Sequence, residues 1–448
     1  MLKKEPWLRY TDGLQDEPVE ALEEGKDADK YKERVREILS MDDGDPRREE
    51  LAGAVYDEIQ SLPVKKDYPY HEPSHLEGIK AARPVGRKPA AGCNFSDVKL
   101  YDKIYGAWLG RCAGCLLGKP VEGWRRDKIR GFAVDTENYP LQFYMSSDIG
   151  GELRKKYDPP EWGAWINKVS YMPEDDDTNY TVIGLKILEE YGPGFTPDDV
   201  AECWLRNLPI LHVCTAERVA YRNLVNRIFP PASASFRNPY REAIGAQIRA
   251  DFFGYCTPGN PELGAEMAWR DASISHVKNG IYGEMFTAAM LSAAAVSNDA
   301  EEVIRVGLAE IPDKSRLAEK VRNVLGWRKE GLTWERAIDR IHRDFNENSH
   351  QWLHTISNAV IVCVGLLFGE LDLEKSISTA VLSAFDTDCN GATVGSIVGM
   401  MLGAEALPEK WIKPLNDQLK SGVDGFGLVK ISEMAKRTLD MARKVGEK

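Results

Sequence analysis

The sequence predicts an all-α protein. Many stretches place Ala, Leu, Ile and Met every three or four positions, which is the spacing of the buried face of a helix. Strict alternation of apolar and polar residues, which marks a half-buried strand, is rare. We therefore expect a compact domain of many helices, preceded by a partly helical N-terminal extension.

The apolar spacing predicts individual helices along the whole chain. Two of them, at 31–41 and 51–62, fall in the first part of the sequence. The later ones are expected at 104–118, 181–191, 284–296, 356–367, 374–384 and 392–402. Residues 63–95 contain five prolines, a composition typical of a linker. We therefore divide the chain into an acidic extension with a proline-rich linker, 1–98, and a helical domain, 99–448.

The expected helix at 104–118 carries glycines four residues apart, at Gly106, Gly110, Gly114 and Gly118. In a helix this spacing places them on one face. Each glycine costs about 1 kcal/mol relative to alanine. The stripe therefore predicts that another helix or a ligand approaches this backbone closely.

Composition excludes several classes of protein. The net charge of −12 argues against binding to nucleic-acid backbones, which requires a basic surface. The first 98 residues hold 22 acidic and 16 basic side chains, half of that net charge, and we expect this excess to be solvated. The longest apolar stretch, 356–368, is too short to span a membrane and no secretory signal is visible, so a cytoplasmic protein is expected.

Cysteine usage predicts neither a disulfide scaffold nor a zinc site. Eight cysteines are few for 448 residues, and Cys112 and Cys115 form a lone C-x-x-C. We interpret these two as buried free thiols. The segment HEPSH, from His71 to His75, matches the zinc-protease pattern, but Pro73 opposes the helix that this pattern needs.

The first chemical signal is the acidic run PEDDDT, which contains Asp175, Asp176 and Asp177. It begins an apolar helical stretch, where the helix dipole favours negative charge. Asp177 is a fair N-cap for this helix. Capping needs only one carboxylate, so the other two indicate a further role.

The second signal is FDTDCNG, with Asp386 and Asp388 between two apolar helical runs. Buried carboxylates must be paired or bound to metal. No Arg or Lys lies within ten residues of Asp386, so a hard divalent cation fits better, although a capping turn remains an alternative. If both runs meet in space, their carboxylates would suit two bridged cations.

Four segments give the chain a family resemblance. They are DKIYGAWLGRCAGCLLGKPVE, DDDT, TPGNPELGAEMAWRDASISHVKNGIYGEMF and FDTDCNGATVGSIVGMMLGA. In this order they resemble the ADP-ribosylglycohydrolase family over about residues 99–412. The resemblance implies an all-α fold with two divalent cations, Mg²⁺ or Mn²⁺, that hold ribose hydroxyls.

The resemblance also implies roles for individual residues. The metal ligands would be Asp175, Asp176, Asp177, Asp386, Asp388 and Cys389. The catalytic residues would be Glu122 and Asp177, and the substrate contacts would come from Gly245, Gln247, Arg249 and His276. Trp124 could stack on a base, with core packing as the alternative.

Three positions depart from the family pattern. Asp175 replaces a usual Thr or Ser, Cys389 replaces a Thr that often contacts metal, and Cys115 replaces an Asp of the first helix. These exchanges would alter the metal preference or the substrate.

The resemblance predicts a metal-dependent hydrolase that cleaves a glycosidic bond at C1 of an ADP-ribosyl group. Two alternatives remain open: a glycohydrolase for a smaller nucleoside-like or ribosyl substrate, and a catalytically silent member that binds ligand. The expected partner is a ribosyl compound, with no nucleic-acid backbone and no membrane.

Overall fold

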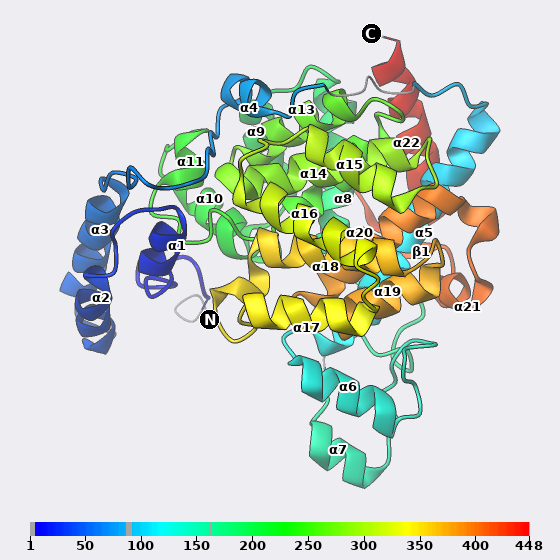
Figure 1. Cartoon of the computed structure of the whole chain (residues 1–448), viewed down its shortest axis with the longest axis horizontal. Coiled ribbons are helices and arrows are strands. Elements are labelled where there is room, and N and C mark those ends of the chain that lie inside the picture. The colour runs from blue at the N-terminus through cyan, green and yellow to red at the C-terminus, as the bar shows by residue number, and fades with distance from the viewer. Residues whose placement is uncertain (1–4, 87–91, 162–163, 448) are drawn as a thin grey trace.

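The computed structural model describes residues 5–86, 92–161 and 164–447. These residues form 22 α-helices and one two-stranded sheet, which confirms the all-α prediction. Figure 1 shows a central helical body from which α2 and α3 project at one end and α6 and α7 at another side.

The N-terminal part contains four helices: α1 (Glu17–Glu23), α2 (Tyr31–Ser40), α3 (Arg47–Gln60) and α4 (Leu76–Ala82). The central body begins with α5 (Asp97–Gly118), and the short 3₁₀ turn η2 (Lys119–Val121) follows it directly. Then come α6 (Arg126–Asp135), α7 (Gly151–Tyr157), α8 (Asp176–Tyr191), α9 (Pro197–Asn207), α10 (Thr215–Val225), α11 (Ala232–Ser235), α12 (Asp251–Tyr255) and α13 (Pro261–Ala272).

The C-terminal half completes the body. Its helices are α14 (Lys278–Ala294), α15 (Ala300–Ala309), α16 (Arg316–Lys329), α17 (Trp334–Asp344), α18 (Thr355–Phe368), α19 (Leu373–Leu382), α20 (Thr387–Leu402), α21 (Glu409–Ile412) and α22 (Ile431–Gly446). A hairpin of β1 (Gln418–Ser421) and β2 (Gly427–Lys430) precedes α22, and the sequence pattern did not predict it.

The core is built on the contact between α5 and α20. A Cβ on Gly106, Gly110 or Gly114 would collide with the carbonyl oxygen of Gly399, Gly395 or Gly391, respectively. The order of these contacts shows that the two helices run antiparallel. The glycine stripe therefore contacts a second glycine stripe, which confirms the predicted close approach and identifies a helix as its partner.

The acidic extension is not simply solvated, which corrects one expectation from the sequence. Glu17, Glu20 and Glu24, in α1 and just after it, are almost completely buried. Arg241 of the central body pairs with Glu17 at 2.7 Å and with Glu24 at 3.0 Å. Buried carboxylates need such partners, so α1 is anchored to the body by charge.

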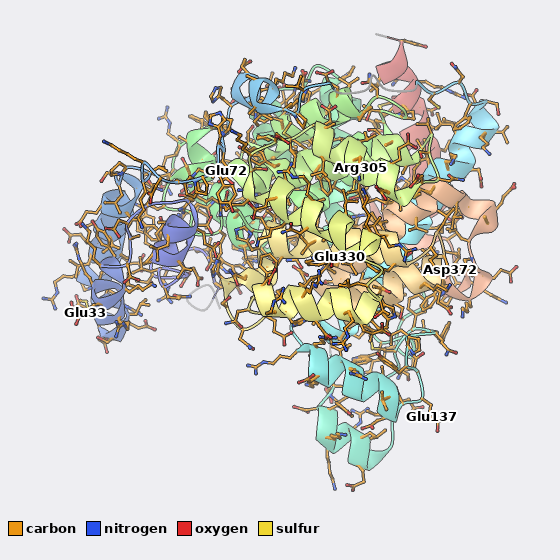
Figure 2. All side chains as sticks on the ribbon, in the orientation of Figure 1. Glu33, Glu72, Glu137, Arg305, Glu330 and Asp372 are labelled. Atoms are coloured by element: carbon orange, nitrogen blue, oxygen red, sulfur yellow. The ribbon has the colours of Figure 1, made fainter. Side chains whose placement is uncertain are left out.

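The outer helices of the extension have their own small core. Its buried side chains include Val35 and Ile38 of α2 and Val55 and Ile59 of α3. Figure 2 shows Glu33 of α2 at the outer end of the molecule and Glu72 where the linker meets the body. The outer helices therefore carry part of the solvated charge that the sequence predicted.

Candidate active site

The first acidic run lies at the start of α8, as the sequence predicted. The N-cap is Asp175 and not Asp177, because the Asp175 Oδ1 accepts the backbone N–H of Asp177 at 3.0 Å. Capping fixes Asp175 and leaves Asp177 free to point into the protein, where its side chain is completely buried.

The second acidic run lies in the turn between α19 and α20. Ala384 and Phe385 both have positive φ, of 61° and 59°, which is unusual for residues with a Cβ. This turn delivers Asp386, the N-cap residue of α20, and Asp388 in its first turn. Both carboxylates are more than nine-tenths buried.

Lys119 joins the two runs. Its ammonium nitrogen lies 2.8 Å from Asp175 Oδ2, 2.9 Å from Asp388 Oδ2 and 2.9 Å from Glu122 Oε2. We call Glu122, Asp175, Asp177, Asp386 and Asp388 the carboxylate cluster. The two acidic runs, which the sequence placed on separate helices, therefore meet in space, and Lys119 lies between them.

Glu122 is the carboxylate of the cluster that the solvent reaches best, with 30% of its side chain exposed. The negative charge of Asp388 and partial burial raise the pKa of Glu122 to about 7, against the opposing effect of Lys119. A carboxyl group with this pKa exchanges protons near neutral pH, which is what general acid–base catalysis requires.

Asp177 has a different environment. Arg111, fully buried in α5, lies 3.3 Å from Asp177 Oδ1 and 2.8 Å from Asp251 Oδ2. The Arg111 guanidinium also donates to the backbone carbonyls of Asp177 and Ile248. Arg111 therefore fixes the start of α8 from behind the carboxylate cluster.

Two cysteines border the cluster. The Cys115 thiol lies 3.8 Å from Asp177 Oδ2, and candidate ligand atoms of Cys115, Asp175, Asp177 and Asp388 all lie within 4.8 Å of one another. A second such group joins Cys389 to Asp386 and Asp388. Burial raises the pKa of both thiols, so they are protonated unless a cation displaces the proton.

The donor set fits a divalent cation. Asp386 Oδ1 and Asp388 Oδ1 are buried, and within the described parts of the chain neither has a hydrogen-bond partner. Unpartnered buried carboxylate oxygens are costly, and a cation would satisfy them. Asp176 is only half-buried and its oxygens belong to neither group of candidate ligand atoms.

The predicted substrate contacts form a buried layer behind the cluster. His276 is completely buried, and Arg249 pairs with Glu217 at 2.6 Å and with Asp271. Gln247 accepts a hydrogen bond from Thr355 at 3.0 Å. A Cβ on Gly245 would overlap the Glu217 carboxylate. The structure does not bring these four residues into the cluster.

A pocket of about 300 Å³ lies next to the chain segments that carry Glu122 and Asp386. Two of its lining residues, Gly123 and Phe385, are chain neighbours of Glu122 and Asp386. Trp352 also lines it, as does Trp124, which packs on Phe132 and Tyr157 in the interior. Trp124 therefore packs against core residues at the edge of the pocket, and stacking on a base stays a prediction.

Sequence reasoning missed Lys119 and Arg111. Lys119 directly precedes the P-V-E segment, and Arg111 is the only charged residue in the predicted helix at 104–118. Such a lone charge predicts a buried partner, and both residues could have been found on that ground.

The HEPSH segment is not on a helix. α4 begins at Leu76, after His75, and both histidines are exposed while Glu72 pairs with Arg316. This arrangement confirms that the segment does not form the zinc-protease motif.

Comparison with known families decides the assignment. The sequence model described as ADP-ribosylglycohydrolase matches residues 96–447. The chain belongs to the ADP-ribosylglycohydrolase family. Membership places it among glycohydrolase-type enzymes, with a buried acidic cluster that could hold metal.

Other comparisons add less. A solved structure titled "ADP-ribosylglycohydrolase-related protein complex" is 19% identical to this chain, with a TM-score of 0.46. The match covers 78% of this chain and 99% of the chain in that structure. No curated protein matches the sequence. In the described ranges, every helix is too short or too polar to span a membrane.

Proposed function

We propose that this family member hydrolyses the glycosidic bond at C1 of an ADP-ribosyl group, with the help of a divalent cation, Mg²⁺ or Mn²⁺. The observation that carries this proposal is the convergence of five carboxylates, from the end of α5 and the starts of α8 and α20, beside a pocket. Carboxylates near C1 stabilise the oxocarbenium-like transition state of glycoside hydrolysis.

Glu122 is our candidate for the acid–base residue. It is partly exposed, whereas Asp177 is completely buried and held by Arg111. Glu122 would donate a proton to the leaving atom as the bond at C1 breaks and water adds to C1. Asp177 would instead position the cluster. The sequence had given both Glu122 and Asp177 a catalytic role, and we now propose that role for Glu122.

Asp386, Asp388 and Cys389 would hold the cation, because their candidate ligand atoms lie within 4.8 Å of one another and one buried oxygen of each aspartate has no hydrogen-bond partner in the described residues. When bound, a divalent cation orients ribose hydroxyls and acidifies a water molecule. Asp388 also contacts Lys119, so the cation site and the lysine share one carboxylate.

The four buried residues that the sequence predicted as substrate contacts would act by holding the carboxylate cluster in place. Arg111 donates to the carbonyl of Ile248, which connects the segment 245–249 to Asp177. We therefore propose that Gly245, Gln247, Arg249 and His276 position the site and do not contact the substrate directly.

A smaller ribosyl compound, such as a nucleoside, is a second candidate substrate. The pocket next to the segments of Glu122 and Asp386 measures about 300 Å³, the lower end of the range for ligand pockets.

The proposal is tested with a panel of ADP-ribosyl-arginine, ADP-ribosyl-serine, O-acetyl-ADP-ribose and nucleosides, each incubated with Mg²⁺ or Mn²⁺. We expect release of a free ribosyl product by the unaltered protein and a loss of at least about 100-fold in Asp388→Asn. Asp372→Asn, on the exposed face shown in Figure 2, is the matched control, since asparagine still caps α19. Metal binding without turnover of any substrate would instead indicate a silent member of the family.

A further inference from the structure

Lys119 has the surroundings of a bound cation. Its ammonium group lies within 3 Å of the carboxylates of Glu122, Asp175 and Asp388. The side chains of Asp175 and Asp388 are only 1% and 2% exposed. These carboxylates come from two helices and a turn. The positive charge of the lysine therefore attracts negative charges from three separate elements.

The backbone of Lys119 is fixed in this position. A Cβ on Gly118 would lie 2.2 Å from the carbonyl oxygen of Thr387, so the two chains are in close contact. The Thr387 hydroxyl donates to the Gly118 carbonyl at 2.9 Å. The end of α5 and the start of α20 therefore hold Lys119 and Asp388 as neighbours.

The ammonium group and a divalent cation cannot both lie between the same two oxygens. A divalent cation needs carboxylate oxygens at about 2.0–2.6 Å. Asp175 Oδ2 and Asp388 Oδ2 already lie 2.8 and 2.9 Å from the ammonium nitrogen. A cation between these two oxygens would displace the lysine.

On the Asp386 side of the cluster, carboxylate oxygens remain without partners among the described residues. Asp388 Oδ1 and Asp386 Oδ1 are buried and, in the described residues, lack hydrogen-bond partners. Together with Cys389 they form one of the groups whose ligand atoms lie within 4.8 Å of one another. Asp388 therefore has one oxygen for Lys119 and one oxygen free for a metal.

We propose that Lys119 is a built-in cation of this site, so that the cluster binds one divalent cation, on the Asp386 side, and not the two predicted from the sequence. Asp388 bridges the ammonium group and the metal. Lys119 thereby determines the metal stoichiometry of the site that the proposed function uses.

The test counts metal ions and does not depend on turnover. The protein is dialysed against Mn²⁺ and its metal content is measured by mass spectrometry, with Mn²⁺ titration calorimetry as the second readout. We expect one ion per chain in the unaltered protein and two in Lys119→Met, which keeps the aliphatic stem and removes the charge. Lys375→Met, at an exposed lysine paired with Glu370, is the control and should bind one ion.

Further variants keep the proposal falsifiable if Lys119→Met does not fold. Asp386→Asn should bind no ion, and Lys119→Arg should still bind one. Two ions in the unaltered protein, none in it, or the same number in Lys119→Met would overturn the proposal. A protein that binds one ion but cleaves no ribosyl substrate would support this inference and contradict the proposed function.

Discussion

Arg111 combines two roles at the scale of a single residue. It forms ion pairs with Asp177 and Asp251, and it donates to the carbonyls of Asp177 and Ile248. All of these groups are buried in the core. The position of Asp177 at the carboxylate cluster therefore depends on a residue that does not itself face the pocket.

Removing Arg111 should destabilise the fold strongly. Arg111→Met leaves two buried carboxylates without their cation, and breaking a buried pair in this way costs about 3–5 kcal/mol. The free energy of unfolding in urea measures the loss. Arg305→Met is the control, because Figure 2 shows Arg305 on the surface, where it pairs with Glu301. An equal effect of the two changes would contradict the role given to Arg111.

At the scale of helices, the contact of α5 with α20 places the functional groups. The glycine stripes let the two backbones touch, and the contact continues to Gly118 and Thr387, next to Lys119 and Asp388. A shift of either helix would separate the lysine from its carboxylates. Packing and chemistry are therefore coupled through one helix pair.

Gly110→Ala should test this coupling. The added Cβ would lie 2.0 Å from the Gly395 carbonyl oxygen, and such overpacking costs typically about 1–3 kcal/mol. Gly326→Ala in α16 is the control, because nothing lies within 4 Å of its Cβ position. Alanine there should stabilise the protein by about 0.5–1 kcal/mol. Urea unfolding of both variants gives the comparison, and a stable Gly110→Ala would refute close contact of the helices.

The attachment of α1 should depend on pH. Burial opposes the ionisation of both groups, but His350 and His354 lower the pKa of Glu23 to about 2, and Glu23 raises the pKa of His350. The two lie 3.4 Å apart. A histidine whose pKa rises on folding stabilises the folded state below its unfolded pKa of about 6.5. This stabilisation is lost as the pH rises through the higher folded pKa.

His350→Gln should therefore destabilise the protein more at pH 6 than at pH 8.5. Urea midpoints of the variant and the unaltered protein at both pH values measure the difference. His71→Gln, at an exposed histidine, should show no such dependence. A difference that grows with pH would have the wrong sign for this ion pair.

At the scale of the whole molecule, the sequence predicted the helices and the acidic runs well. The glycine stripe and the carboxylates at 175–177 and 386–388 are local patterns, and local patterns identify helix faces and helix ends. The partner of Asp388 was not predictable in this way. A search of ten residues on either side of Asp386 cannot find Lys119, which only the packing of α5 on α20 brings near.

The same reason explains the error about the extension. Glu17 and Glu24 belong to an acidic stretch interspersed with basic residues, and their partner Arg241 lies more than 200 residues away. Long-range pairing of charges is a property of the complete fold. The family resemblance supplied the site's residues but not this charge balance.

We propose that the carboxylate cluster performs metal-dependent hydrolysis at C1 of an ADP-ribosyl group. The most direct measurement is the rate of release of free ADP-ribose from ADP-ribosyl-arginine and ADP-ribosyl-serine, with Mn²⁺ and with EDTA, for the unaltered protein and Asp386→Asn. We expect release from at least one substrate with Mn²⁺, its loss in EDTA, and its loss in the variant. Release that persists in EDTA or in Asp386→Asn, or no release from either substrate with Mn²⁺, would contradict this function.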